Sequence, residues 1–269
     1  LDGHSARRYG LKMTGLTLSH VVEFLSGQPW PTAMQQIRCV VIDGRTAEAG
    51  DLFVALPGEQ TDGHNFIAQA FERGALAALI HQDVQADCQM IDLRSAPLHL
   101  PSLLSLPVCL RVENTLAALQ QLAAAWRARL DVGVIGVTGS VGKSSTKELI
   151  WAVLSRQFCT YKNEGNLNNE IGLPLSLLEL RQEHRRAVLE MGMYAIGEIA
   201  LLCRLARPVV GVITNVGPVH LSRLGTIEAI AQAKAELVQA LPPAPQGVAI
   251  LNYDDALVRQ MASRTAAAV

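Results

Sequence analysis

The feature that most constrains this chain is an apolar segment followed directly by a glycine-rich loop and then by a helical pattern. Residues 132–137 have the length and composition of a buried strand, and a helix is expected from Lys143 onward. The loop between them reads Thr138-Gly139-Ser140-Val141-Gly142-Lys143-Ser144-Ser145. Its glycines permit backbone angles that aim successive amides at one anion, and the start of the helix adds partial positive charge. The order strand, loop, helix predicts an α/β fold that holds a phosphate group.

Two side chains in this loop suit a nucleotide. Lys143 would neutralise the terminal phosphates, and Ser144 would offer its hydroxyl to Mg²⁺. The alternative is an ordinary glycine turn before a helix. The usual phosphate loop has a glycine five residues before Gly142, where this chain has Val137. This shorter form disfavours a phosphotransferase or GTPase, and the guanine-reading pattern Asn-Lys-x-Asp is also absent.

The rest of the second half repeats the alternation of strand and helix. Strands are expected at 132–137, 187–190, 209–214 and 248–251, and helices at 143–156, 197–205 and 226–241. This alternation is typical of a doubly wound, mostly parallel sheet, in which ligands bind at the carboxyl ends of the strands. We therefore expect residues 108–269 to form a phosphate-loop domain.

The first half indicates a smaller mixed α/β domain over residues 13–107. Strands are expected at 37–42, 51–56 and 77–80 and a helix near 67–73, and the Pro- and Ser-containing segment 94–107 ends the unit. A helix over 115–130, capped by Asn114, would connect the two domains. Residues 1–12 are interpreted as a leader or added segment, because Met13 opens a more natural start.

The composition excludes several classes of protein. The net charge of −1 disfavours a general nucleic-acid binder, which needs clustered Lys and Arg. Five scattered cysteines without a Cys-x-x-Cys pair disfavour a disulfide framework or a zinc site and favour a reducing compartment. With no apolar run long enough for a membrane span and no signal-peptide pattern, we expect a cytoplasmic protein, and we predict a monomer.

Polar residues gather where the expected strands end. The run 163–174 is dense in Asn and Gly, Glu190 ends a strand, and 215–220 follows the next one. Each also has a structural interpretation: a turn, a solvated acid and, for His220, an ordinary surface or core histidine. Lys234 similarly looks like any helical lysine.

Taken together, these motifs resemble the Mur ligase family. The loop resembles the family's short Thr-Gly-x-x-Gly-Lys-Ser form, and Asn215–His220 with Leu221 resembles its Asn-x-x-x-x-His-Leu segment. The run Gly-Asn-Leu-Asn-Asn-Glu-Ile-Gly-x-Pro is similar to that of the branch that acts on D-alanyl-D-alanine, so Asn166, Asn168 and Asn169 are expected to bind substrate. Many members also have an Asn-His pair where this chain has the stretch Met193-Tyr194-Ala195, so the role of that pair does not carry over.

The resemblance implies a metal centre beside bound ATP. It makes Glu190 a Mg²⁺ ligand with Ser144, and it makes His220 a ligand of a second Mg²⁺. It implies that Lys234 is carbamylated and orients the metal, and that Asn252 lies near the adenine. Lys143, Lys234 and His220 are thus the expected catalytic residues.

The first domain resembles the uridine-nucleotide-binding domain of the same family. Asp43-Gly44-Arg45-Thr46 and Asp62-Gly63-His64 carry the likeness, although the family commonly has Ser in place of Gly44. We expect Arg45, Thr46, Asp62, Gly63 and His64 to line the nucleotide pocket. A purely structural strand-turn-strand unit is the alternative.

The implied reaction joins D-alanyl-D-alanine to UDP-N-acetylmuramoyl-tripeptide through an acyl phosphate, at the expense of ATP, in peptidoglycan precursor synthesis. Family members carry a third, C-terminal domain, so we expect this chain to lack it and not to be fully active alone. Three alternatives stay open: another Mur ligase, a folylpolyglutamate synthase-like ligase, and a truncated nucleotide-binding fragment without activity.

Overall fold

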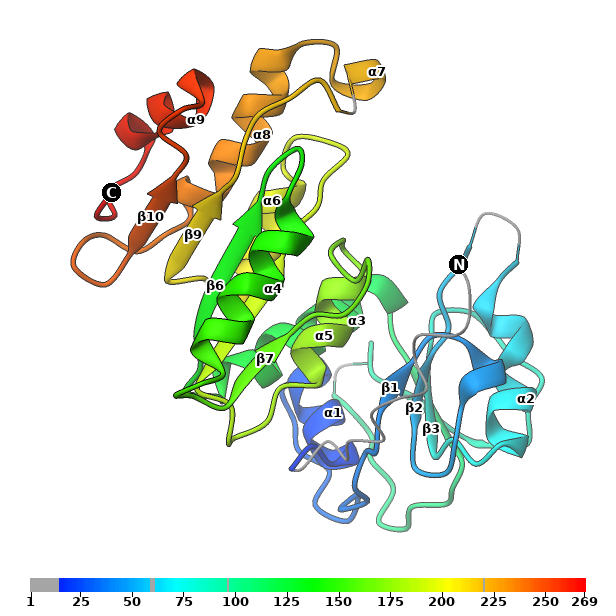
Figure 1. The fold of residues 1–269 in the computed structure, drawn as a ribbon. Helices are drawn as coiled ribbons and strands as arrows, with labels where there is room; N and C mark the ends of the chain where they lie inside the picture. Colours follow the sequence, from blue (N-terminus) through cyan, green and yellow to red (C-terminus); the bar gives the residue numbers. More distant parts are fainter. Residues whose placement is uncertain (1–14, 59–60, 96, 220) are drawn as a thin grey trace. The chain divides into compact units, whose positions relative to one another are not determined.

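The computed structural model describes residues 15–58, 61–95, 97–219 and 221–269. The chain divides into two compact units, one ending at Trp126 and one spanning Arg127–Val269 (Figure 1). Each unit contains a five-stranded sheet in which every strand pair is parallel. The α/β class expected from the sequence is confirmed. No helix in the described part of the chain is long and apolar enough to cross a membrane.

The first sheet has the order β1-β2-β3-β5-β4. Its strands are β1 (Val40–Val41), β2 (Leu52–Val54), β3 (Ala77–Ile80), β4 (Gln89–Asp92) and β5 (Val108–Arg111). All residues of β2 and β3 are buried, as is usual for a parallel sheet covered on both faces. Helical elements of this unit are α1 (Leu18–Ser26), η1 (Gly44–Thr46), η2 (Gly63–Phe66), α2 (Ile67–Glu72) and most of α3 (Thr115–Ala128).

The division between the units differs from the sequence-based boundary at 107. Strand β5 follows that boundary, yet it pairs with β3 on one side and β4 on the other. The buried side chains of β5 therefore belong to the hydrophobic core of the first unit. The expected cap of α3 is confirmed, because the Asn114 Oδ1 accepts a hydrogen bond from the Ala117 amide at 2.9 Å.

The second sheet has the order β10-β9-β6-β8-β7. Its strands are β6 (Gly133–Thr138), β7 (Thr160–Lys162), β8 (Arg186–Glu190), β9 (Val210–Ile213) and β10 (Val248–Leu251). The helices are α4 (Lys143–Leu154), α5 (Gly172–Leu178), α6 (Glu198–Ala206), α7 (Leu221–Leu224), α8 (Ile227–Gln239) and α9 (Ala256–Gln260), followed by η3 (Met261–Arg264).

Helices cover both faces of this second sheet. Ile135 and Val137 of β6 pack in one cluster with Trp151 of α4. The intervening Gly136 faces the opposite side, where an added Cβ would lie 2.9 Å from Leu237 of α8. Because side chains alternate along a strand, α4 and α8 lie on opposite faces. This is the doubly wound arrangement, and it brings the carboxyl ends of all five strands to one edge.

Candidate functional site

The glycine-rich loop lies between β6 and α4, at the carboxyl edge of the second sheet. Gly142 caps α4 with φ of 83°, a conformation that favours glycine. The first main-chain bond of the helix runs from the Thr146 amide to the Gly142 carbonyl at 2.9 Å. The amides of the preceding first turn, which include those of Lys143 and Ser144, are those an α-helix leaves without internal acceptors. They are suited to bind a phosphate.

The sequence predicts that the loop amides point at a phosphate, but two of them are bonded to the protein instead. The Ser140 amide donates to the Asn215 carbonyl at 3.0 Å, and the Val141 amide donates to the Asn215 Oδ1 at 2.9 Å. The Thr214 hydroxyl and the Asn215 amide group both donate to the Val141 carbonyl, at 2.7 and 3.0 Å. The segment after β9 therefore holds the front of the loop. Gly139 is required here, because an added Cβ would lie 1.9 Å from the Thr214 Oγ1.

The chain after β10 supports that segment in turn. The Asn252 side chain donates to the Thr214 carbonyl at 2.8 Å, and the Asp255 Oδ2 accepts from the Val216 amide at 2.7 Å. Asp255 also caps α9 through its other oxygen. Asn252 thus lies at the end of the neighbouring strand, behind the phosphate loop.

Glu190 brings the predicted metal ligands together at the end of β8. It is 4% exposed, and its two carboxylate oxygens have different partners. The Ser144 hydroxyl donates to Oε2 at 2.7 Å, and the Asn168 Nδ2 donates to Oε1 at 2.8 Å. Of the three predicted asparagines, Asn166, Asn168 and Asn169, it is Asn168 that makes this contact with the acid. The Asn169 Oδ1 accepts instead from the amides of Ile171 and Gly172, at the start of α5.

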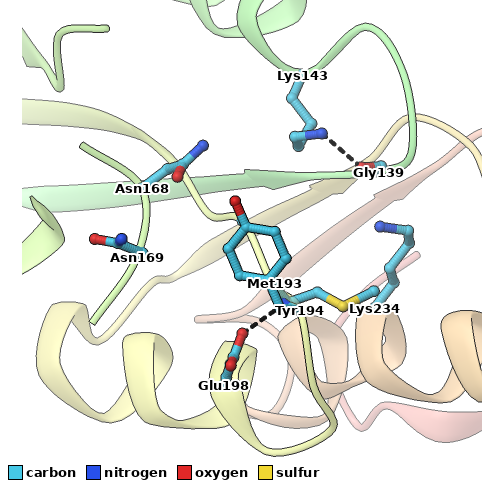
Figure 2. A pocket seen from close by; sticks show the side chains of 9 residues that line it. Gly139, Lys143, Asn168, Asn169, Met193, Tyr194, Glu198 and Lys234 are labelled. Atoms are coloured by element: carbon cyan, nitrogen blue, oxygen red, sulfur yellow. Dashed lines mark hydrogen bonds between the residues drawn. The ribbon is translucent and has the colours of Figure 1, made fainter. Parts of the chain in front are cut away.

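A pocket of about 90 Å³ opens beside the loop (Figure 2). Figure 2 shows Tyr194 between Lys143 and Glu198, with the Lys143 ammonium turned toward Gly139, whose carbonyl it contacts at 3.0 Å. The pocket is lined by Gly139, Lys143, Asn168, Asn169, Gly192, Met193, Tyr194, Glu198 and Lys234. Two ammonium groups and a carboxylate thus share one small, mostly polar space.

Lys234 reaches this pocket from α8 and is 2% exposed. Burial, together with the charge of Lys143, lowers the pKa of Lys234 to about 8. Two residues further along α8, Glu236 accepts from the Gly197 and Ala200 amides at 2.6 and 2.9 Å. The Lys-x-Glu spacing therefore places a lysine in the pocket and a carboxylate at the start of α6.

The residues at this edge fit a magnesium ion bound together with phosphates. Mg²⁺ usually takes one or two protein carboxylates, and phosphate oxygens and water supply the remaining ligands. Glu190 and the Ser144 hydroxyl provide such a set. Within the described ranges, no group of three or more His, Cys, Asp or Glu side chains could hold a metal without such help. His220, the third predicted ligand, lies outside the described residues.

The first unit gathers its predicted residues at the carboxyl edge of its own sheet. An added Cβ on Gly44 of η1 would lie 2.9 Å from the Phe66 carbonyl of η2, so these two elements lie against each other. Arg45 forms an exposed two-pronged ion pair with Asp43, with Nη2 2.8 Å from Oδ2. The Thr46 hydroxyl donates to the Asp43 carbonyl at 2.9 Å.

A chain of hydrogen bonds connects η2 to the end of β3. The Asp62 Oδ1 lies 2.6 Å from the His64 Nδ1, and the His81 amide donates to the His64 Nε2 at 3.1 Å. Burial acts to raise the pKa of Asp62, but the bonds from His64 and Gln82 outweigh it, so this pKa lies below its usual value. Gly63 permits the turn, since an added Cβ would lie 2.8 Å from the backbone of Leu56.

Several members of these networks were not among the predicted site residues. His81, Tyr194, Glu198 and Glu236 are the clearest cases in the described part of the chain. His81 directly follows the predicted strand 77–80, so the rule that parallel strands end at one edge was a usable signal for it. Glu198 carried no such signal, because it begins a helix.

Comparisons with known proteins agree with this geometry. The model of the Mur ligase middle domain matches residues 137–269, and that of the Mur ligase family catalytic domain matches residues 36–127. A curated UDP-N-acetylmuramoyl-tripeptide--D-alanyl-D-alanine ligase of Synechocystis is 44% identical over 229 residues, which are 85% of this chain and 46% of that protein.

Solved structures show the same likeness. A crystal structure of MurF from Acinetobacter baumannii has a TM-score of 0.77 at 33% identity, covering 93% of this chain and 52% of the other. The MurF ligase of Thermotoga maritima in complex with ADP has a TM-score of 0.70 at 32% identity, covering 85% and 49%. The chain spans about half the length of these relatives. With two matched domain models and relatives of this similarity, the chain belongs to the Mur ligase family.

Proposed function

We propose that this chain forms the nucleotide- and muramoyl-substrate-binding part of a ligase that joins D-alanyl-D-alanine to UDP-N-acetylmuramoyl-tripeptide. The observation that carries the proposal is the meeting of Ser144, Asn168 and Glu190 beside the Lys143 loop. It connects a phosphate-binding loop, a carboxylate and the Asn-rich run in one site. The curated relatives named for this ligase, at up to 44% identity, support the choice of substrates.

In this proposal the second unit binds ATP and Mg²⁺. The first-turn amides of α4 and Lys143 hold the phosphates, and Ser144 and Glu190 hold the metal, with His220 proposed as a further ligand. When bound, Mg²⁺ offsets the negative charge that builds up as the substrate carboxylate attacks the γ-phosphate. Lys143 adds a fixed positive charge at the same place. The amine then displaces phosphate from the acyl phosphate, giving the amide, ADP and phosphate.

Lys234 is proposed to be carbamylated. Carbamate formation needs an uncharged amine, and the lowered pKa of Lys234 leaves about a tenth of this amine uncharged at pH 7, far more than for an ordinary lysine. The modified side chain would present carboxylate-like oxygens, which suit a hard cation. Its position in the pocket beside Lys143 supports this role.

The first unit is proposed to bind the uridine-nucleotide part of the substrate. Arg45, Thr46, Asp62, Gly63 and His64 lie at one edge of its sheet, where open α/β sheets bind ligands. The reaction is proposed to take place in the cytoplasm. In support, all five cysteines lie in the described ranges and are free thiols.

Calorimetric titration of the chain with three separate ligands tests this function. We expect UDP-N-acetylmuramoyl-tripeptide and Mg²⁺·ADP to bind and folate not to bind. Binding of folate without the muramoyl nucleotide would reassign the chain to the folylpolyglutamate synthase type. Binding of Mg²⁺·ADP alone would reduce the proposal to a nucleotide-binding module.

A further inference from the structure

Asn163 is a fully buried amide at the end of β7 whose side chain clamps the main chain of Glu190. Its Oδ1 accepts from the Glu190 amide at 2.8 Å, and its Nδ2 donates to the Glu190 carbonyl at 3.1 Å. The two bonds resemble the pairing of one strand with the next, but a side chain makes them. They fix the backbone from which the Glu190 carboxylate projects.

The same Nδ2 also donates to the Leu167 carbonyl at 2.8 Å. Leu167 directly precedes Asn168, whose own amide group contacts the Glu190 Oε1. One side chain therefore holds both the acid and the loop that supplies a hydrogen bond to that acid. We call these three bonds the Asn163 clamp, and Asn163 is not one of the residues that line the pocket.

Lys147 connects the clamp to the phosphate-loop helix. It is 2% exposed, and its Nζ donates to the Asn163 main-chain carbonyl at 2.7 Å. Lys147 lies four residues after Lys143 in α4, which is about one helical turn. A buried cation is costly unless it is hydrogen-bonded, so α4 and the end of β7 are held at a fixed separation.

We propose that Asn163, anchored by Lys147, is a positioning residue that aligns the Glu190 carboxylate with the phosphate loop. The inference rests on the proposed function, in which Glu190 and Ser144 share a magnesium ion. Groups that orient a metal ligand from behind affect metal affinity by about 10- to 100-fold. Loss of the Asn163 clamp should therefore weaken the contribution of Mg²⁺ and leave phosphate binding by the loop amides in place.

The experiment measures the Kd of ADP by calorimetry, in EDTA and in Mg²⁺, for the wild-type chain and for Asn163→Ala. The Kd in EDTA divided by the Kd in Mg²⁺ gives the factor by which the metal strengthens ADP binding. We expect Asn163→Ala to lower this ratio by about 10-fold or more, with the Kd in EDTA within about twofold of wild type. A purely structural role would raise both Kd values together and leave the ratio unchanged, which would overturn the proposal.

Ser176→Ala is the matched control, because it removes another fully buried polar side chain from the same unit. The Ser176 hydroxyl donates to the Gly172 carbonyl of α5 at 3.0 Å, so its loss should lower stability without changing the ratio. If Asn163→Ala does not fold, the same two Kd values are measured for Lys147→Met. An unchanged Kd ratio in that variant overturns the proposal. If the wild-type chain binds ADP with no gain from Mg²⁺, the proposed metal site itself fails, and that outcome is distinct.

Discussion

At the scale of single residues, Lys234 carries a measurable electrostatic cost. Its pKa of about 8 in the folded chain lies below its ordinary value of 10.5. Between these values the unfolded chain holds a proton that the folded chain does not, so stability rises with pH in this window. The cost, on the order of 3 kcal/mol, is fully present below pH 8. Lys234→Met should remove it.

Urea unfolding of both proteins at pH 7 and pH 10, in buffer free of carbon dioxide, measures this difference. We expect the variant to gain stability relative to wild type at pH 7 and to lose most of that gain at pH 10. Parallel pH profiles would show that the Lys234 amine keeps its ordinary pKa. Adding ¹³C-bicarbonate to the wild type should give a carbamate carbon signal that Lys234→Met lacks.

At the scale of elements, the phosphate loop depends on the segment that follows β9. An alanine at position 139 would place its Cβ 1.9 Å from the Thr214 Oγ1, so the loop must move away from Asn215. Gly139→Ala should therefore weaken ADP binding by about 100-fold, the loss of roughly 3 kcal/mol of favourable contacts.

The double variant Gly139→Ala/Thr214→Ala tests the cause. Without the Thr214 hydroxyl, the closest remaining contact of the new Cβ relaxes to 3.1 Å, and we expect about half of the lost binding free energy to return. Titration calorimetry with ADP gives both values, and Thr214→Ala alone is the control. If the double variant binds ADP as weakly as Gly139→Ala does, the cause is the backbone conformation at position 139 and not the contact with Thr214.

Continuous apolar runs predicted several strands, including the edge strand β10, whereas the buried strand β5 was not predicted from its sequence. Strands β3 and β10 begin and end where the apolar runs 77–80 and 248–251 predict. Strand β7 is a three-residue edge strand with every residue partly exposed, so it has no apolar run to detect. Helix α1 was also missed, although Thr17 caps it. The pairing of Asn215 with Val141 joins residues 74 positions apart, and no local pattern encodes it.

At the scale of the whole molecule, two compact units imply two separable responses to ligand. Each unit has its own parallel sheet and its own buried core. A ligand at 100 times its Kd stabilises the state that binds it by about 2.7 kcal/mol. We expect ADP with Mg²⁺ to slow hydrogen exchange in strands β6, β8 and β9, and the muramoyl nucleotide to slow it in β2 and β3.

Hydrogen exchange followed by mass spectrometry, with each ligand alone, measures this division. The domain boundary proposed from the sequence, at 107, assigns β5 to the second unit, whereas pairing assigns it to the first. Protection of β5 by the muramoyl nucleotide would support the structural division. Equal protection of both sheets by either ligand would show that the chain responds as one cooperative body.

The carboxylate of Glu236 at the start of α6 affects where the negative end of a ligand can bind in the pocket. Two helices, α4 and α6, begin beside the pocket, and each would attract an anion through its free amides. Glu236 already accepts from the Gly197 and Ala200 amides, so α6 is internally neutralised. Of these two helix starts, that of α4 is therefore the better receptor for an anion, and Lys143 and Lys234 add positive charge to the same pocket. The negative end of a ligand is drawn to the start of α4 and away from the carboxylates of Glu198 and Glu236 at the start of α6.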